Sequence, residues 1–194
     1  MSADGRPGLL VLVVGPSGVG KDTLIDGARA ALAHDPAIVF PRREITRPAD
    51  AGGEDHRPVT PAEFRARRSS NAYALAWEAH GLGYGVPATI LDDLDAGRTI
   101  VVNVSRGIID TARRLARVRV LSLTVPAEIL RRRLAARGRE TVEDIEARVA
   151  RATAFAVAGP DVVTVVNDGS IESALARVID AIRSDAHAQG VSSF

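Results

Sequence analysis

The chain alternates between short, almost purely apolar runs and longer segments in which apolar residues recur every three or four positions. Such runs are typical of buried strands, and the second pattern is typical of amphipathic helices. The runs predict strands at 9–14, 37–40, 99–104, 119–125 and 162–166, with a weaker strand at 73–77. The periodic segments predict helices at 23–32, 60–68, 87–96, 105–116, 126–137, 141–156 and 170–186. Because buried strands alternate with helices, we expect an α/β fold of three layers, a parallel sheet with helices on both faces.

Local signals support several of these boundaries. Thr60 opens a capping box that has proline at the first helical position, and Thr141 and Ser170 are residues of the type that caps a helix. Gly, Pro and charged residues are frequent between the elements. We therefore expect 41–60 to be irregular and 81–85 to be a flexible turn.

The first strand, turn and helix carry the motif G-x-x-x-x-G-K. Its members, with the two residues that follow, are Gly15, Pro16, Ser17, Gly18, Val19, Gly20, Lys21, Asp22 and Thr23. Backbone N–H groups of such a P-loop bind phosphates at a helix N-terminus, and the lysine ammonium reaches the β and γ phosphates. Lys21 is the only lysine among 25 basic residues, so the chain keeps its one compact ammonium for this position. The alternative is a chance glycine-rich turn, which the flanking strand and helix disfavour.

Asp22 and Thr23 follow the lysine where P-loops commonly place a hydroxyl ligand for magnesium. A carboxylate and a hydroxyl are both oxygen donors that suit Mg²⁺, so both residues are potential ligands. The alternative for Asp22 is an acidic residue that complements the helix dipole in the first turn.

Composition narrows the class of protein. With 194 residues, 46% of them hydrophobic, the chain can bury one substantial core, and we expect one domain over 1–194. It has no cysteine, and its four histidines lack the spacing of metal ligands, so we expect neither a disulfide nor a transition-metal site. We expect a cytoplasmic protein, because the N-terminus resembles no signal peptide and no apolar run approaches the ~20 residues of a membrane helix. His56 and His80 are expected on the surface and Trp77 in the core.

Charge does not indicate a nucleic-acid partner. The net charge is only +1, although nine arginines lie between 113 and 139. Aromatic residues make up 4% of the chain and do not interleave with these arginines, so no stacking surface for bases is expected. We expect small-molecule partners, no membrane partner, and leave the oligomeric state open.

Several further motifs, in order, resemble the guanylate kinases over nearly the whole chain. They are the P-loop, Ile45-Thr46-Arg47-Pro48, Tyr84-Gly85, 134–138 with Arg148, and Val166-Asn167-Asp168. Within that superfamily the chain is most similar to the ribose 1,5-bisphosphate phosphokinases of phosphonate metabolism. The segments that carry this likeness are Gly20-Lys21-Asp22, 45–47, Trp77, 81–86, 101–106, 137–140 and 167–170.

The resemblance implies a P-loop NTPase fold with an acceptor-binding insert at about 41–97 and a lid at about 131–152. It implies transfer of the γ-phosphoryl group of ATP, with Mg²⁺, to ribose 1,5-bisphosphate, which gives 5-phosphoribosyl 1-diphosphate and ADP. Lys21, Arg137 and Arg148 would be catalytic, and Asn167 would lie against adenine. Residues expected to bind the acceptor phosphates or hydroxyls are Arg42, Arg43, Arg47, Tyr84, Asn103, Ser105 and Arg106.

The chain departs from guanylate kinases where that family holds GMP. Asp50, His56, Val86 and Asn103 stand at those places. Each hydrogen bond left unmade in a closed site costs about 1–3 kcal/mol, so several together disfavour GMP by orders of magnitude. Guanylate kinase is therefore the second hypothesis. A catalytically inactive binding module is a third, which the presence of Lys21 and the lid arginines disfavours.

If Asp22 helps to bind magnesium, Asp22→Asn raises the Mg²⁺ concentration needed for half-maximal activity. A magnesium titration of the phosphotransferase reaction at saturating ATP measures this concentration. A titration that coincides with that of the unchanged protein contradicts the role.

Overall fold

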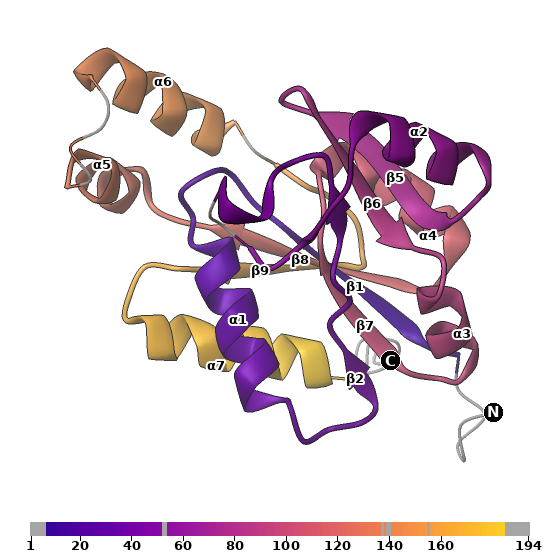
Figure 1. The fold of residues 1–194 in the computed structure, drawn as a ribbon. Helices are drawn as coiled ribbons and strands as arrows, with labels where there is room; N and C mark the ends of the chain where they lie inside the picture. The colour runs from indigo at the N-terminus through magenta and orange to yellow at the C-terminus, as the bar shows by residue number, and fades with distance from the viewer. Residues whose placement is uncertain (1–6, 52–53, 137, 139–140, 155, 185–194) are drawn as a thin grey trace, which may run out of the picture.

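A computed structural model describes residues 7–51, 54–136, 138, 141–154 and 156–184. Its central sheet has five strands, all parallel (Figure 1). In spatial order they are β2 (Ile38–Val39), β7 (Thr99–Asn103), β1 (Leu9–Val14), β8 (Val118–Thr124) and β9 (Val162–Val166). The expected parallel α/β fold is confirmed. Since β1 lies in the middle of the sheet, the motif that follows it lies at the centre of the sheet's carboxyl edge.

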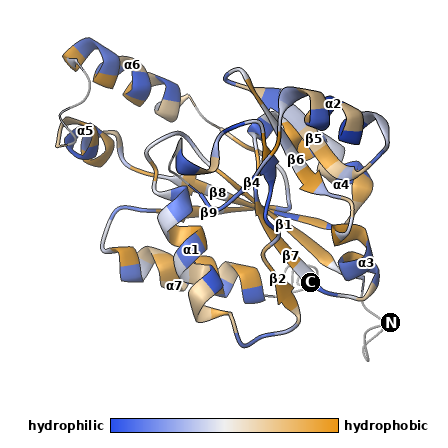
Figure 2. Ribbon diagram, in the orientation of Figure 1, coloured by the Kyte–Doolittle hydropathy of each residue, from blue (hydrophilic) through white to orange (hydrophobic). Residues whose placement is uncertain are grey.

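The alternation of side chains along β1 divides the core into two layers. Leu9, Val11 and Val13 pack with helices α1 (Lys21–Ala31) and α7 (Ile171–Arg183) on one face. The even-numbered residues of β1 pack on the other face with α3 (Ile90–Asp95) and α4 (Ile109–Leu115). Every residue of β1 is buried, which explains its unbroken apolar run, and Figure 2 shows the strands as the most hydrophobic part of the fold.

A second, smaller sheet lies beside the first, and two of its four strands fall within 41–60, which was expected to be irregular. Its order is β4 (Arg57–Pro58), β3 (Glu44–Ile45), β6 (Leu82–Pro87) and β5 (Tyr73–Ala79). The pair β3 and β4 is parallel, and the other two pairs are antiparallel. Helix α2 (Pro61–Ser69) packs against this sheet, and a short 3₁₀ helix, η1 (Ala49–Ala51), follows β3. The two strands of two residues each carry no periodic pattern, so sequence alone did not reveal them.

The expectation of a flexible turn at 81–85 is wrong. The turn is confined to His80 and Gly81, both with positive φ, and β6 begins at the next residue. The glycines further along have a packing role rather than a flexible one. A Cβ on Gly83 would lie 2.7 Å from the ring of Phe64, and a Cβ on Gly85 would lie 2.4 Å from the ring of Tyr73. Their lack of a side chain lets these two rings cover the strand.

The helices largely follow the expected order, with corrections at their ends. The segment expected to be helical from 87 becomes helical only at Ile90, because β6 extends to Pro87. The segment 105–116 contains a 3₁₀ turn, η2 (Arg106–Ile108), before α4. The predicted caps at Thr60, Thr141 and Ser170 are confirmed, since each side chain accepts a backbone hydrogen bond at the start of its helix.

Two helices, α5 (Ala127–Ala135) and α6 (Val142–Thr153), project from the sheet at the upper left of Figure 1. Their buried residues Leu130, Leu134, Ile145 and Val149 form a cluster separate from the two main ones. Within the part of the chain that the structure describes, no helix has the length and apolar character needed to cross a membrane.

A buried carboxylate ties the second sheet to α2. Glu44 is 1% exposed, and it accepts a hydrogen bond of 2.6 Å from the Tyr73 hydroxyl. Its other contacts are ion pairs with Arg67 at 2.7 Å and with Arg57 at 3.4 Å. Buried charge is tolerated only when it is paired in this way. The network fixes β3, whose flanking residues Arg43 and Arg47 enter the site described below.

We expect Tyr73→Phe to lower the free energy of unfolding at pH 7 by about 2 kcal/mol, because it leaves a buried carboxylate short of one donor. Burial, and secondarily the Glu44 carboxylate, raises the pKa of Tyr73 from 10.0 to about 12. The folded state therefore favours the neutral phenol, and this stabilisation is complete below pH 10 and lost as the pH rises through about 12. Urea unfolding of both proteins between pH 7 and 12 measures the difference. Equal stability at pH 7 would contradict the role of the hydrogen bond.

Candidate active site

The P-loop joins β1 to α1 and folds around its own lysine. Gly18 and Gly20 have φ values of 92° and 93°, a left-handed conformation that favours glycine. The Lys21 ammonium donates to the carbonyl oxygens of Gly15 at 2.8 Å and Pro16 at 3.0 Å. The helix begins at Lys21, two residues earlier than expected, so its first N–H groups face the cavity at the end of the sheet.

Burial lowers the pKa of the Lys21 ammonium from 10.5. The negative charges of Asp22 and Glu54 oppose this effect, whereas the positive charge of Arg43 adds to it. These couplings indicate that the P-loop and the second sheet place their charges in one electrostatic environment. An anion of two or more charges is the natural counterpart of such a group of cations.

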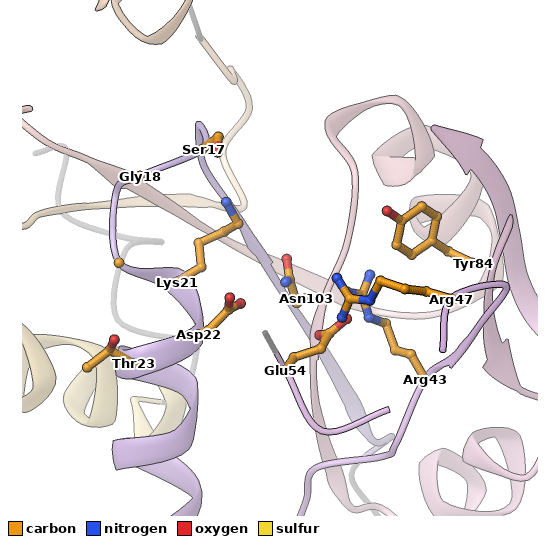
Figure 3. A pocket seen from close by; sticks show the side chains of 11 residues that line it. Ser17, Gly18, Lys21, Asp22, Thr23, Arg43, Arg47, Glu54, Tyr84 and Asn103 are labelled. Atoms are coloured by element: carbon orange, nitrogen blue, oxygen red, sulfur yellow. The ribbon is translucent and has the colours of Figure 1, made fainter. Parts of the chain in front are cut away.

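A cavity of about 350 Å³ opens between the P-loop and the second sheet (Figure 3). Its lining residues are Ser17, Gly18, Gly20, Lys21, Asp22, Thr23, Arg43, Arg47, Glu54, Tyr84 and Asn103. In Figure 3 the P-loop residues lie on one side and Arg43, Arg47 and Tyr84 on the other, with the Glu54 carboxylate beside the two arginines and Asn103 between the two sides. The sequence predicted ten of these eleven residues as parts of the site, and only Glu54 was missed.

Arg43 is held from several directions although its side chain is only 7% exposed. Its guanidinium carbon lies 5.1 Å from the centre of the Tyr84 ring and 5.5 Å from that of Trp77. Those two rings stack on each other at 5.4 Å, and Trp77 also packs against the core cluster, as expected for a core residue. The carboxylate of Glu54 accepts a hydrogen bond from Arg43 and completes its surroundings. Cation–π contact and an ion pair together fix the guanidinium in place.

His56 is buried rather than exposed, which corrects the expectation made from the sequence. It is 3% exposed and lies between two backbone carbonyls. Its Nε2 is 3.1 Å from the oxygen of Arg47, and its Nδ1 is 3.0 Å from the oxygen of Glu54. The imidazole thus links the backbone of Arg47 to that of Glu54, and both of these residues line the cavity. The burial of His56 depends on a loop that folds back toward β3, so no local sequence pattern could have predicted this burial.

The remaining predicted residues lie around the cavity rather than in its lining. Gly15, Pro16 and Val19 complete the loop, and Arg148 of α6 donates to the hydroxyl of Ser17 at 2.8 Å. Asn167 is buried under the loop and donates to the Val19 carbonyl at 2.8 Å, so its contact with adenine stays a prediction.

Three predicted acceptor residues do not line the cavity. The Arg42 side chain is exposed and pairs with Asp55 at 2.7 Å. Ser105 precedes η2, and Arg106 is exposed on it. Their roles stay predictions. Arg137 lies outside the described residues.

The residues present fit a hard divalent cation that takes only part of its ligands from the protein. Asp22 and Thr23 are exposed oxygen donors that line the cavity beside Lys21. Among the described residues, no group of three or more His, Cys, Asp or Glu side chains is suited to hold a metal. Mg²⁺ in phosphotransferases commonly takes its remaining ligands from phosphates and water, so this sparse donor set suits it.

Sequence comparisons place the chain among known kinases. A family model described as an AAA domain matches residues 10–157. The chain is 58% identical over 149 residues to "Ribose 1,5-bisphosphate phosphokinase PhnN" of Acidiphilium cryptum, covering 77% of this chain and 80% of that one. It is 53% identical over 164 residues to the protein of the same name from Rhodopseudomonas palustris, covering 84% and 82%.

A longer relative matches nearly the whole chain. The "Bifunctional ribose 1,5-bisphosphokinase-thymidine phosphorylase" of Cupriavidus pinatubonensis is 47% identical over 185 residues, or 95% of this chain. The chain spans only 31% of the length of that relative. Among solved structures, the guanylate kinase of Anaplasma phagocytophilum superposes with a TM-score of 0.64 at 22% identity, covering 94% of this chain and 88% of that one. This likeness shows that the fold is that of a guanylate kinase.

Because the chain has a single lysine, its pKa can be measured directly. In protein labelled with ¹³C-lysine, we expect the ε-carbon signal to titrate with a midpoint below 10.5, since burial disfavours the ammonium. Asp22→Asn should lower the midpoint further, because it removes a negative charge that favours the ammonium. The same signal in denaturant supplies the ordinary value. A folded-state midpoint equal to that value would contradict the proposed burial of the charge.

Proposed function

Because this chain belongs to the ribose 1,5-bisphosphate phosphokinase family, we propose that it transfers the γ-phosphoryl group of ATP to the 1-phosphate of ribose 1,5-bisphosphate. The products are 5-phosphoribosyl 1-diphosphate and ADP. An oxygen of the 1-phosphate forms a bond to the γ-phosphorus, and the bond from that phosphorus to the β,γ-bridging oxygen breaks. ADP leaves with the electron pair, so atoms and charge balance without a further reactant.

One observation carries the proposal, namely the convergence of Lys21, Arg43 and Arg47 on one small polar cavity. The Nε atoms of Arg43 and Arg47 are buried and lack a hydrogen-bond partner among the described residues. Buried donors of this kind are costly unless an acceptor is supplied. A phosphorylated acceptor supplies several oxygen acceptors and negative charge at once.

The proposed chemistry requires no general base. A phosphate monoester has a second pKa of about 6 and is largely ionised at neutral pH, so the attacking oxygen already carries charge. Among the described residues that line the cavity, Asp22 and Glu54 carry carboxylates, and neither needs to remove a proton in this reaction. The work of the site is to position two anions against each other and to offset their repulsion.

Each side of the cavity has its own part in this proposal. The P-loop N–H groups and Lys21 bind the ATP phosphates, and the arginines of the second sheet bind the acceptor. Mg²⁺, held by Asp22 and Thr23 together with phosphate oxygens, would supply charge neutralisation on the triphosphate. Arg148 contacts Ser17 of the P-loop, and we assign to it the binding of the phosphoryl group in transfer. We retain Arg137 as a second lid arginine.

The proposal treats 1–194 as one kinase domain, with an acceptor-binding insert at 41–97 and a lid at 131–152. The insert includes the second sheet, its connecting loops and α2, and its residues Arg43, Arg47, Glu54 and Tyr84 line the cavity. The lid includes most of α5 and α6, and its Arg148 donates to the hydroxyl of Ser17 in the P-loop. Thus donor and acceptor would approach from opposite walls.

The same geometry speaks against GMP as the acceptor. Val86 is fully buried and offers no hydroxyl, and both ring nitrogens of the buried His56 lie within 3.1 Å of backbone carbonyl oxygens. Asp50 is exposed on η1 and does not line the cavity. Only Asn103, of the four residues at the places where guanylate kinases hold GMP, faces the cavity. A guanine base would leave most of its hydrogen-bonding groups unmatched.

An ADP-release assay with ATP and Mg²⁺ compares ribose 1,5-bisphosphate with GMP, and Lys21→Ala serves as the blank. We expect kcat/KM for the sugar bisphosphate to exceed that for GMP by about 100-fold or more, since several hydrogen bonds to guanine are missing. Preference for GMP would instead identify a guanylate kinase. Absence of turnover with both, by a protein that binds ATP, would favour the inactive binding module.

A further inference from the structure

Glu54 lines the cavity, and the mechanism above gives its carboxylate no role. It belongs to the short segment between η1 and β4, and its side chain is 19% exposed. One carboxylate oxygen, Oε1, accepts the hydrogen bond from Arg43. The second oxygen, Oε2, makes no hydrogen bond with any residue that the structure describes. In Figure 3 the carboxylate is turned toward the guanidinium groups of the acceptor wall.

A carboxylate in this place conflicts with the binding of phosphate alone. The proposed acceptor carries two phosphates, and like charges in one cavity repel each other. Asp22 has a role as a magnesium ligand on the opposite wall, whereas Glu54 lies on the wall of Arg43 and Arg47, away from that role. Its presence is explained if the acceptor also brings hydrogen-bond donors, because an ionised carboxylate is an acceptor only.

We propose that Glu54 recognises the vicinal hydroxyl groups of the sugar, at C2 and C3 of the ribose ring. This inference rests on the proposed function. It names the chemical groups of the acceptor that Glu54, on the side of the cavity opposite the P-loop, would bind. The C2 hydroxyl is adjacent to the C1 phosphate in the covalent structure of the sugar. A residue that binds this hydroxyl must therefore lie beside the group that binds the phosphate, and Glu54 contacts Arg43 directly.

The surroundings hold the carboxylate in position for this role. Its backbone carbonyl lies 3.0 Å from Nδ1 of the buried His56, and its side chain is bound by an arginine that two aromatic rings fix. A residue whose backbone and carboxylate are both already held in place loses little conformational entropy when a ligand binds. A site built to bind a hydroxyl rejects an analogue that lacks it, because its polar group is then left without a partner.

The test measures affinity by calorimetry, without ATP, for ribose 1,5-bisphosphate and its 2-deoxy and 3-deoxy analogues. We expect the unchanged protein to bind ribose 1,5-bisphosphate about 10- to 100-fold more tightly than at least one of the deoxy analogues. Glu54→Gln should reduce that ratio to within about threefold, because the variant loses the preference for the hydroxyl groups. The glutamine amide oxygen can still accept from Arg43, so the variant removes the charge and one acceptor but keeps that contact.

Two further variants separate recognition from general effects. Asp55→Asn removes the neighbouring charge, which pairs with Arg42 on the surface, and should leave the ratio unchanged. Glu54→Asp keeps a carboxylate and should retain part of the discrimination. Thermal unfolding of each variant checks the fold, and the Asp variant supplies the test if the Gln variant does not fold.

The outcomes distinguish this inference from the proposed function. Equal loss of affinity for all three sugars in Glu54→Gln would mean that the carboxylate only positions Arg43, and an unchanged ratio would exclude contact with the hydroxyls. Either result overturns the inference. Failure of the unchanged protein to release ADP with ribose 1,5-bisphosphate would overturn the proposed function, whereas the binding ratio reports on Glu54 independently.

Discussion

The structure depends on keeping several cations close together in a cavity that must later receive anions. Lys21, Arg43 and Arg47 all line it, and burial of unpaired charge costs several kcal/mol. Each has partners from within the protein that a phosphate can replace or supplement. Lys21 donates to two carbonyls of its own loop, and Arg43 lies against two aromatic rings and one carboxylate. The carbonyls and rings are neutral, and Glu54 is the one carboxylate among these partners, so the cations are stabilised with little opposing charge in the cavity.

Because these cations must stay close together, the strand that carries the two arginines has to be held firmly in place. The arginines come from the ends of a strand only two residues long, which could not hold them alone. The buried Glu44, with Tyr73 and Arg67, fixes that strand between its neighbours and α2. On the other side of the cavity, Asn167 and Arg148 hold the P-loop by its Val19 carbonyl and its Ser17 hydroxyl. Both walls are thus supported by polar contacts from elements distant in sequence, which restrict the positions of charged groups more strictly than apolar packing does.

The parts that the sequence made predictable are those with local signals. The burial of β1 on both faces produces an apolar run, the P-loop requires glycines at fixed spacing, and capping residues mark helix starts at Thr60, Thr141 and Ser170. Strands β3 and β4 and the burial of His56 arise from pairing between segments and leave no periodic trace. The glycines of β6 were misinterpreted because a glycine that accommodates a ring looks the same in sequence as one that permits a turn. Glu54 was missed because an acid in an irregular, charged stretch carries no motif.

The division between the two walls also separates the general from the specific part of the activity. The P-loop wall follows from a motif whose chemistry is the same for any ATP phosphate, and the fold around it accommodates many acceptors. The second sheet and its loops contain the differences from guanylate kinases: a buried valine at 86, a histidine close to backbone carbonyls, and a carboxylate beside Arg43. None of these groups presents a surface shaped for a planar base, whereas a small ring with phosphate and hydroxyl groups matches both the cations and the carboxylate. Under the proposed function, acceptor choice would therefore be set by a few polar side chains on and beside the smaller sheet rather than by the central sheet that determines the fold.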